Sequence, residues 1–294
     1  MKISFCSIAF RHRPMLLEDM IFIISELGYD GIEIWGDHLK GYETSLEKIK
    51  KLLYWKNLEV SMISPYFDFT GSTQKWNSSI LTGRKFIQFA KELDCSLIRC
   101  FTGAVPSELA TERHWKRCIE GIKYIAGIAK EENITLAIET HPNTLADTIE
   151  STMRLVETVN EDNVKVNLDF YNMWETERIS PLKLLNMLYP WVVHIHAKNA
   201  VLSKGRISPF CYIMDKNRDL TGIRNLSNGD LDYDLILRGL IDKGYDRYIS
   251  IECFETSRGP LRIAKEEIAY LRHTLSSFRS LQINNLQLPA KNRL

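Results

Sequence analysis

Residues 134–169 read ITLAIETHPNTLADTIESTMRLVETVNEDNVKVNLD, and this stretch decides the fold. An apolar, β-branched run ends at Glu139, an amphipathic run follows with Asp147 or Thr148 as its N-cap, and a second β-branched run ends at Asp169. A strand, a helix and a strand in this order predict parallel strands joined by a right-handed crossover.

The same alternation extends over the rest of the chain. Further strands are predicted at 3–8, 31–35, 58–63, 97–101, 192–198 and 248–253. Helices are predicted at 16–27, 44–56, 77–93, 112–131, 148–160, 180–189, 232–243 and 261–278. Eight such units, with no G-x-G-x-x-G or Walker A motif, predict an α/β fold of the (β/α)₈ TIM barrel type. We expect one barrel domain over 1–280 and a peripheral C-terminal tail over 281–294.

Composition narrows the class of partner. The 294 residues are 45% hydrophobic and 26% charged, with a formal net charge of +1, which provides no long-range attraction for nucleic acid or an anionic membrane. The start of the chain is too short for a signal peptide, and the six cysteines form no C-x-x-C pair. We therefore expect a cytoplasmic protein that acts on a small molecule, with a homo-oligomer left open.

Four of the predicted strands end on metal-ligating residue types. These residues, which we call the strand-end cluster, are Glu139, Asp169, His196 and Glu252. Barrel active sites form where the strands end, so three carboxylates and an imidazole are expected to converge. Like charges repel unless a cation neutralises them. We predict one divalent metal ion, with Mn²⁺ favoured and Mg²⁺, Co²⁺ or Zn²⁺ as alternatives on ligand type. Helix capping or pairing with arginine is the structural alternative.

Two further histidines share a strand face with members of this cluster. His141 lies on the same face as Glu139 but closer to solvent, where an imidazole can act as a general base. A hydrogen bond to the following loop is the alternative. His194 lies one layer deeper than His196 and is predicted to pack behind the ligands.

Other side chains are predicted to line a substrate pocket at the barrel mouth. Arg99 and Lys198 could grip an anionic substrate, and the planar fork of arginine suits a carboxylate. A salt bridge to an inner carboxylate is the alternative for both. Glu33, Tyr66 and Phe254 are also candidate substrate contacts, although packing is the alternative for the aromatic rings. The long connection over 199–231 is predicted to be a lid or a mobile surface segment.

Several motifs carry a family resemblance. Residues 31–36 (GIEIWG), together with the strand-end cluster, resemble the xylose isomerase-like barrels, a superfamily of sugar isomerases, epimerases and endonuclease IV. A narrower resemblance is to the bacterial 3-dehydroshikimate dehydratases of petrobactin siderophore biosynthesis. It is carried by ETHPNT at 139–144, NLDF at 167–170, PW at 190–191 and HIHAKN at 194–199.

This resemblance implies a lyase that converts 3-dehydroshikimate to 3,4-dihydroxybenzoate (protocatechuate) and water for catecholate siderophore biosynthesis. It implies that the strand-end cluster holds the metal, that His141 is the catalytic base, and that Arg99, Tyr66 and Lys198 contact the substrate. Tyr212 in the long connection would be another contact. The chain departs from related barrels at Asn172, where they often carry a histidine.

Three alternatives remain open at this point. A ketose isomerase or epimerase uses the same elementary step, but a neutral sugar has no carboxylate to offset the burial of Arg99. An endonuclease IV-like enzyme would need several histidine ligands for a cluster of metal ions, and a basic surface for DNA. Seven histidines and a net charge of +1 do not favour either feature. A non-catalytic ligand-binding barrel would have no need for both a base and a complete set of ligands.

Overall fold

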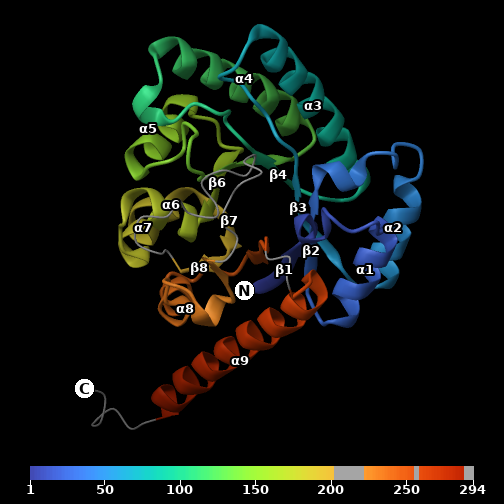
Figure 1. Ribbon diagram of the computed structural model, residues 1–294, viewed down its shortest axis with the longest axis vertical. Helices are drawn as coiled ribbons and strands as arrows, with labels where there is room; N and C mark the ends of the chain where they lie inside the picture. Colours follow the sequence, from blue (N-terminus) through green and yellow to red (C-terminus); the bar gives the residue numbers. More distant parts are fainter. Residues whose placement is uncertain (202–221, 255–257, 288–294) are drawn as a thin grey trace.

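The computed structural model describes residues 1–201, 222–254 and 258–287, and in it eight parallel strands close into a barrel ringed by helices (Figure 1). Around the barrel the order is β1-β10-β7-β6-β5-β4-β3-β2. The strands are β1 (Lys2–Cys6), β2 (Gly31–Trp35), β3 (Glu59–Ser64), β4 (Leu97–Cys100), β5 (Thr135–Glu139), β6 (Val164–Asp169), β7 (Val192–Ala197) and β10 (Tyr248–Ile251). The predicted (β/α)₈ barrel is confirmed.

The α-helices cover the outside of this barrel, and α9 continues past it as a long rod towards the C-terminus (Figure 1). They are α1 (Leu17–Glu26), α2 (Leu46–Trp55), α3 (Thr73–Glu92), α4 (Glu112–Glu131), α5 (Ile149–Val159), α6 (Phe170–Glu177), α7 (Pro181–Leu188), α8 (Tyr233–Asp242) and α9 (Pro260–Gln287). Short 3₁₀ turns are η1 (Ser7–Phe10), η2 (Gly36–Leu39), η3 (Ser107–Leu109), η4 (Tyr189–Trp191) and η6 (Leu226–Asn228). None of the helices in the described part of the chain is long and apolar enough to cross a bilayer.

Two faces of the barrel wall differ in chemistry. Outward-facing residues such as Ile138 and Ile195 belong to one large apolar core between the strands and the helices. Inside the barrel a small, separate apolar cluster comprises Met62, Ala137 and Val193. A barrel interior is usually filled by layers of bulky branched residues. Here most of the inward positions nearer the carboxyl ends are polar instead, and these polar side chains form the candidate site.

Three local features differ from the expected elements. Helix α6 was not expected, because it begins directly after β6 without a linker, and Asp169 itself is its N-cap. The ends of the long connection pair as a two-stranded antiparallel sheet of β8 (Asn199–Ala200) and β9 (Ile223–Arg224). Helix α9 runs to Gln287 rather than ending at 278, so it enters the segment expected to be a tail. Neither Gly nor Pro interrupts the sequence there before Pro289.

Candidate active site

The strand-end cluster comes together at the carboxyl ends of β5, β6, β7 and β10. Each of its four residues offers a ligand atom, and these atoms all lie within 4.8 Å of one another. His196 Nδ1 is 3.2 Å from Glu139 Oε1, 3.8 Å from Glu252 Oε2 and 3.9 Å from Asp169 Oδ2. All four side chains are buried. The closed barrel therefore converts four strand ends, far apart in sequence, into one oxygen-rich cluster.

Two buried cations border the cluster. Arg99 Nη1 lies 3.0 Å from Glu139 Oε2 and 3.9 Å from Glu252 Oε1. Lys198 Nζ lies 2.8 Å from both Asp169 Oδ2 and Glu252 Oε2. Both cations therefore make the salt bridges to inner carboxylates that were the alternative to substrate contact.

The donor set fits a divalent metal ion. Glu139 Oε2 and Asp169 Oδ2 are buried and accept no hydrogen bond from the residues that the structure describes, although a cation lies within ion-pair distance of each. With Glu33 included, four buried carboxylates face two permanent cations, so a divalent ion would restore neutrality. Three carboxylates and one imidazole are ligands typical of Mn²⁺ or Mg²⁺ and are also compatible with Co²⁺ or Zn²⁺.

The pKa shifts within the cluster reflect these opposing charges. Burial alone would raise the pKa of Glu139, but the Arg99 guanidinium and His196 outweigh it and hold that pKa well below its usual range. Burial raises the pKa of Asp169 to about 6, although Lys198 opposes the shift. Neighbouring carboxylates of one cluster are thus pushed in opposite directions, as expected where negative charges crowd together.

His141 lies two residues after Glu139 and presents one ring nitrogen without a partner. Its Nδ1 is 2.7 Å from the carbonyl oxygen of Pro142, and because a carbonyl only accepts, Nδ1 carries the proton. The Nε2 atom is buried and has no hydrogen-bond partner among the described residues. Burial lowers the pKa of His141 to about 4. The ring is therefore a neutral imidazole with an unprotonated Nε2 at neutral pH.

Aromatic rings surround the mouth above these charges. The ring of Phe101 packs edge-on against His141 at 4.9 Å between centroids, and Tyr66 packs against Phe101 at 5.4 Å. The guanidinium carbon of Arg99 lies 4.3 Å from the centre of the Tyr66 ring. Phe254 lies 5.4 Å from Lys198 Nζ. Tyr66 is 37% exposed and Phe101 is partly exposed, so solvent reaches both rings. The predicted contact Tyr212 lies outside the described residues.

Glu33 does not lie at the mouth. Its side chain has no exposed surface and lies on the far side of His196 from the three other carboxylates. Both oxygens are 3.1 Å from His196 Nε2, and Oε2 is 3.2 Å from His194 Nε2. His194 thus lies behind the cluster, as predicted from its position one layer deeper.

A second network ties the ends of β5 and β6 together, and it was missed from sequence. The Asp169 backbone N–H donates to Thr140 Oγ1 at 2.9 Å, and Asn172 Nδ2 donates to the Thr140 carbonyl oxygen at 3.0 Å. Asp169 Oδ1 accepts from the Asn172 backbone N–H at 2.9 Å. The polar residue directly after Glu139 and the asparagine three residues after Asp169 were the available signals.

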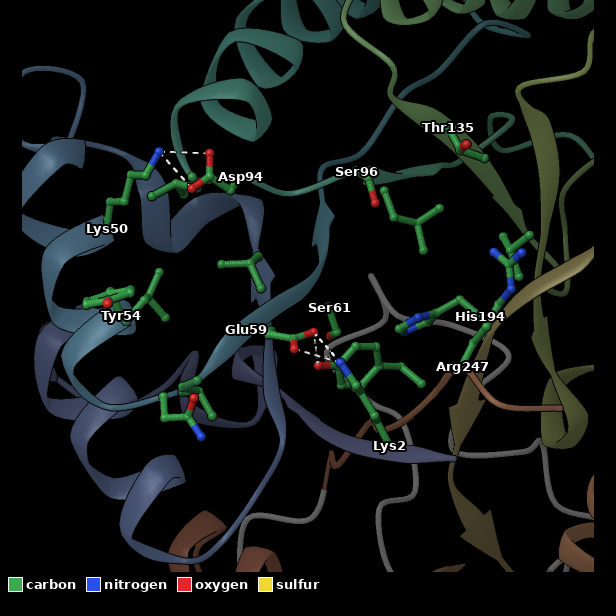
Figure 2. Close-up of a pocket in the computed structure, with 18 of the residues that line it drawn as sticks. Lys2, Lys50, Tyr54, Glu59, Ser61, Asp94, Ser96, Thr135, His194 and Arg247 are labelled. Atoms are coloured by element: carbon green, nitrogen blue, oxygen red, sulfur yellow. Dashed lines mark hydrogen bonds and ion pairs between the residues drawn. The ribbon is translucent and has the colours of Figure 1, made fainter.

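A large cavity lies at the opposite end of the barrel. It has a volume of about 1280 Å³ and is lined by the amino ends of several strands, including Lys2, Glu59 and Thr135 (Figure 2). No member of the strand-end cluster lines it. Its charged side chains already pair with each other, as in Lys2 with Glu59. Size alone therefore points away from the chemistry, and we place the site at the carboxyl ends.

Known proteins resemble this chain over most of its length. A 3-dehydroshikimate dehydratase of Bacillus anthracis is 33% identical over 263 residues, which cover 86% of this chain and 91% of that protein. An inosose dehydratase of Clostridium perfringens is 23% identical over 274 residues, covering 85% of this chain and 88% of that protein.

Solved structures also resemble this chain over most of its length. The crystal structure of the probable 3-DHS dehydratase AsbF, involved in the petrobactin synthesis from Bacillus anthracis, matches with a TM-score of 0.82 and 29% identity over 92% of this chain and 99% of that one. A D-tagatose 3-epimerase-like protein matches in fold, with a TM-score of 0.76 and 19% identity over 95% of this chain and 99% of that one. The family model described as xylose isomerase-like TIM barrel matches residues 21–274. The chain therefore belongs to the xylose isomerase-like TIM barrel family.

Proposed function

We propose that this protein is a divalent-metal-dependent 3-dehydroshikimate dehydratase, a lyase that forms 3,4-dihydroxybenzoate and water. The observation that carries the proposal is the Nε2 atom of His141, which has no hydrogen-bond partner in the part of the chain that the structure describes and lies beside a cluster of metal-ligating residue types. A base next to such a cluster suits proton abstraction from carbon beside a carbonyl. Similarity to the Bacillus anthracis dehydratase supports the choice of substrate.

The strand-end cluster would hold the metal, with Nδ1 as the ligand atom of His196. A divalent ion bound there would act as a Lewis acid that polarises the substrate carbonyl. The protein's own contribution is to keep the ligands rigid, because each comes from a barrel strand or from the residue directly after one.

His141 would remove the proton from C4 of the substrate, which lies next to the C3 carbonyl. The bond from C5 to its hydroxyl then breaks, and the departing oxygen takes up a proton to leave as water. Transfer of a C6 proton to the C3 oxygen completes the aromatic ring, so one water is lost and no electrons leave the system. Because burial lowers the pKa of His141, its Nε2 atom is unprotonated at neutral pH and is free to accept this proton.

The ring carboxylate of the substrate needs a cation, and Arg99 and Lys198 are both in the site. Each neutralises carboxylates of the strand-end cluster in this structure. A bound metal ion would add two positive charges beside the same carboxylates, so either cation could then share its N–H groups with the substrate carboxylate. We assign Tyr66 and Phe254 to the wall of the pocket, because their rings pack on these two cations.

The product is a catechol, the group through which catecholate siderophores bind iron. The structurally similar protein AsbF of Bacillus anthracis is involved in petrobactin synthesis. We propose a role in supplying 3,4-dihydroxybenzoate to siderophore assembly on that similarity.

A metal-dependent ketose isomerase or epimerase is the second candidate, since inosose isomerases and a hydroxypyruvate isomerase also match this chain. These enzymes would share the step in which a proton leaves the carbon beside a carbonyl. The two buried cations favour an anionic substrate over a neutral sugar.

The test is turnover of 3-dehydroshikimate by protein loaded with Mn²⁺, Mg²⁺ or Co²⁺, followed by the absorbance of the catechol product. We expect His141→Ala to lower kcat by about 10²–10⁴-fold while metal stays bound. His273→Ala, an exposed histidine on α9, is the matched control and should keep full activity. Absence of product with all three ions, or activity only on a panel of ketoses, would overturn the substrate assignment.

A further inference from the structure

Glu33 is the centre of a hydrogen-bond network beneath the strand-end cluster. It lies on β2 with no exposed surface, and three donors surround its carboxylate. His196 Nε2 lies 3.1 Å from its oxygens, His194 Nε2 lies 3.2 Å from Oε2, and the Ser64 hydroxyl donates to Oε1. Three donors from two strands, one on β3 and two on β7, thus meet at one carboxylate.

We infer that Glu33 is a positioning residue that holds His196 so that its Nδ1 atom faces the metal. This inference rests on the metal dependence in the proposed function. The Nε2 side of the ring is bonded to Glu33, so the Nδ1 side is turned towards Glu139, 3.2 Å away. An imidazole that binds a metal through Nδ1 has one proton, and the acceptor beside Nε2 holds that proton on the side away from the metal.

His194 completes the arrangement from the amino-terminal side. Its ring lies nearly perpendicular to that of His196, at 80°, with 5.8 Å between centroids. His194 also forms part of the wall of the large amino-terminal cavity, where Figure 2 shows it among the lining side chains. The Glu33 carboxylate is therefore clamped between two imidazoles and cannot rotate away from His196 without losing both.

The same geometry argues against direct contact between Glu33 and substrate. His196 lies between Glu33 and the three carboxylates of the strand-end cluster. Both oxygens of Glu33 already accept hydrogen bonds. The Glu33 side chain has no exposed surface, whereas the Tyr66 side chain at the mouth is 37% exposed. A group that touches only the far side of a ligand acts through that ligand.

Outer partners of metal-bound histidines typically change metal affinity by about 10–100-fold when they are removed. The experiment is calorimetric titration of Mn²⁺ into chelator-treated wild-type protein and into Glu33→Gln, which keeps side-chain volume but removes the charge. We expect Glu33→Gln to weaken Mn²⁺ binding by about 10–100-fold. At saturating Mn²⁺ its KM for 3-dehydroshikimate should match that of the wild type, because Glu33 does not reach the substrate.

The matched control is Glu267→Gln on α9. Glu267 is also a buried glutamate, 3% exposed, but its carboxylate accepts from the backbone N–H of Leu226. Its substitution should leave Mn²⁺ affinity unchanged. Ser64→Ala removes the third donor to Glu33 without altering the backbone and should give a smaller loss of affinity in the same direction. It decides the question if Glu33→Gln does not fold.

Each contrary outcome has its own meaning. Unchanged Mn²⁺ affinity in Glu33→Gln, or in Ser64→Ala if only that variant folds, overturns the positioning role and leaves the proposed function intact. A raised KM with unchanged metal affinity makes Glu33 a substrate contact instead. Two ions per wild-type chain and one per Glu33→Gln chain would make Glu33 a ligand of a second metal. A wild-type protein that binds no divalent ion overturns the proposed function itself, and this inference with it.

Discussion

Adding Mn²⁺ to chelator-treated protein should raise its melting temperature, and Glu139→Gln should abolish that rise. The reason is the buried charge at the strand ends. Glu139, Asp169 and Glu252 are buried carboxylates. A divalent ion that binds them in the folded state but finds no such cluster in the unfolded chain stabilises folding by mass action.

The magnitude follows from chain length. Unfolding entropy is about 2.1 cal/mol/K per residue near the midpoint, so 294 residues correspond to about 0.6 kcal/mol/K. A metal concentration 100 times the dissociation constant contributes about 2.7 kcal/mol, which is equivalent to a rise of about 4 °C. Above the dissociation constant, each further tenfold increase adds about 1.4 kcal/mol, or about 2 °C.

Differential scanning fluorimetry over a dilution series of Mn²⁺ measures this slope directly. Glu139→Gln replaces a charged ligand by a neutral amide and should give a flat line over the same series. Glu267→Gln should keep the wild-type slope, whatever its own melting temperature. A wild-type melting temperature that ignores Mn²⁺, Mg²⁺ and Co²⁺ up to millimolar concentrations would refute the charge argument, as would an unchanged slope in Glu139→Gln.

Three further predictions concern other parts of the molecule. Asp169→Asn should weaken Mn²⁺ binding in calorimetry yet keep the helical circular dichroism signal, because an amide oxygen can still cap α6. Burial raises the pKa of Glu267 to about 8 from an ordinary 4.5. Between these pH values the unfolded chain binds fewer protons than the folded protein, so the stability of the fold should decrease as pH rises through this range. Glu267→Gln should therefore flatten the profile of melting temperature against pH. Gly121→Ala places a Cβ 2.3 Å from the buried Phe69 ring and should cost about 1–3 kcal/mol by chemical denaturation, whereas Gly127→Ala in the same helix meets nothing within 4 Å and should not destabilise.

The barrel and the convergence of the strand-end cluster could be predicted because both depend on periodicity. Each strand is a short apolar run, and in a closed parallel barrel the carboxyl ends share one rim. Glu139 and Asp169 end β5 and β6 in the structure, as the pattern requires. Such reasoning needs only the order of elements and the alternation of side chains.

Depth within the barrel could not be predicted in the same way. Glu33 was expected to contact substrate, but the register between β2 and β3 shifts between Ile32 and Glu33, and three donors hold the carboxylate beneath the ligands. Arg99 and Lys198 have long side chains whose partners depend on reach rather than on position along a strand. The sequence cannot distinguish a salt bridge from Arg99 or Lys198 to a buried carboxylate from one to a substrate carboxylate, because both require the same residue at the same position.

The two carboxylate oxygens of Asp169 have different roles, one in a helix cap and one in the strand-end cluster. Its Oδ1 accepts from the first turn of α6, and its Oδ2 faces the strand-end cluster. The rotamer of this ligand is therefore selected when the helix folds, before any cation arrives. A metal ion would bind an Asp169 side chain that is already ordered, so less side-chain conformational entropy would be lost on binding. Substitutions that remove the capping oxygen, unlike Asp169→Asn, would therefore disturb the start of α6 and the strand-end cluster together.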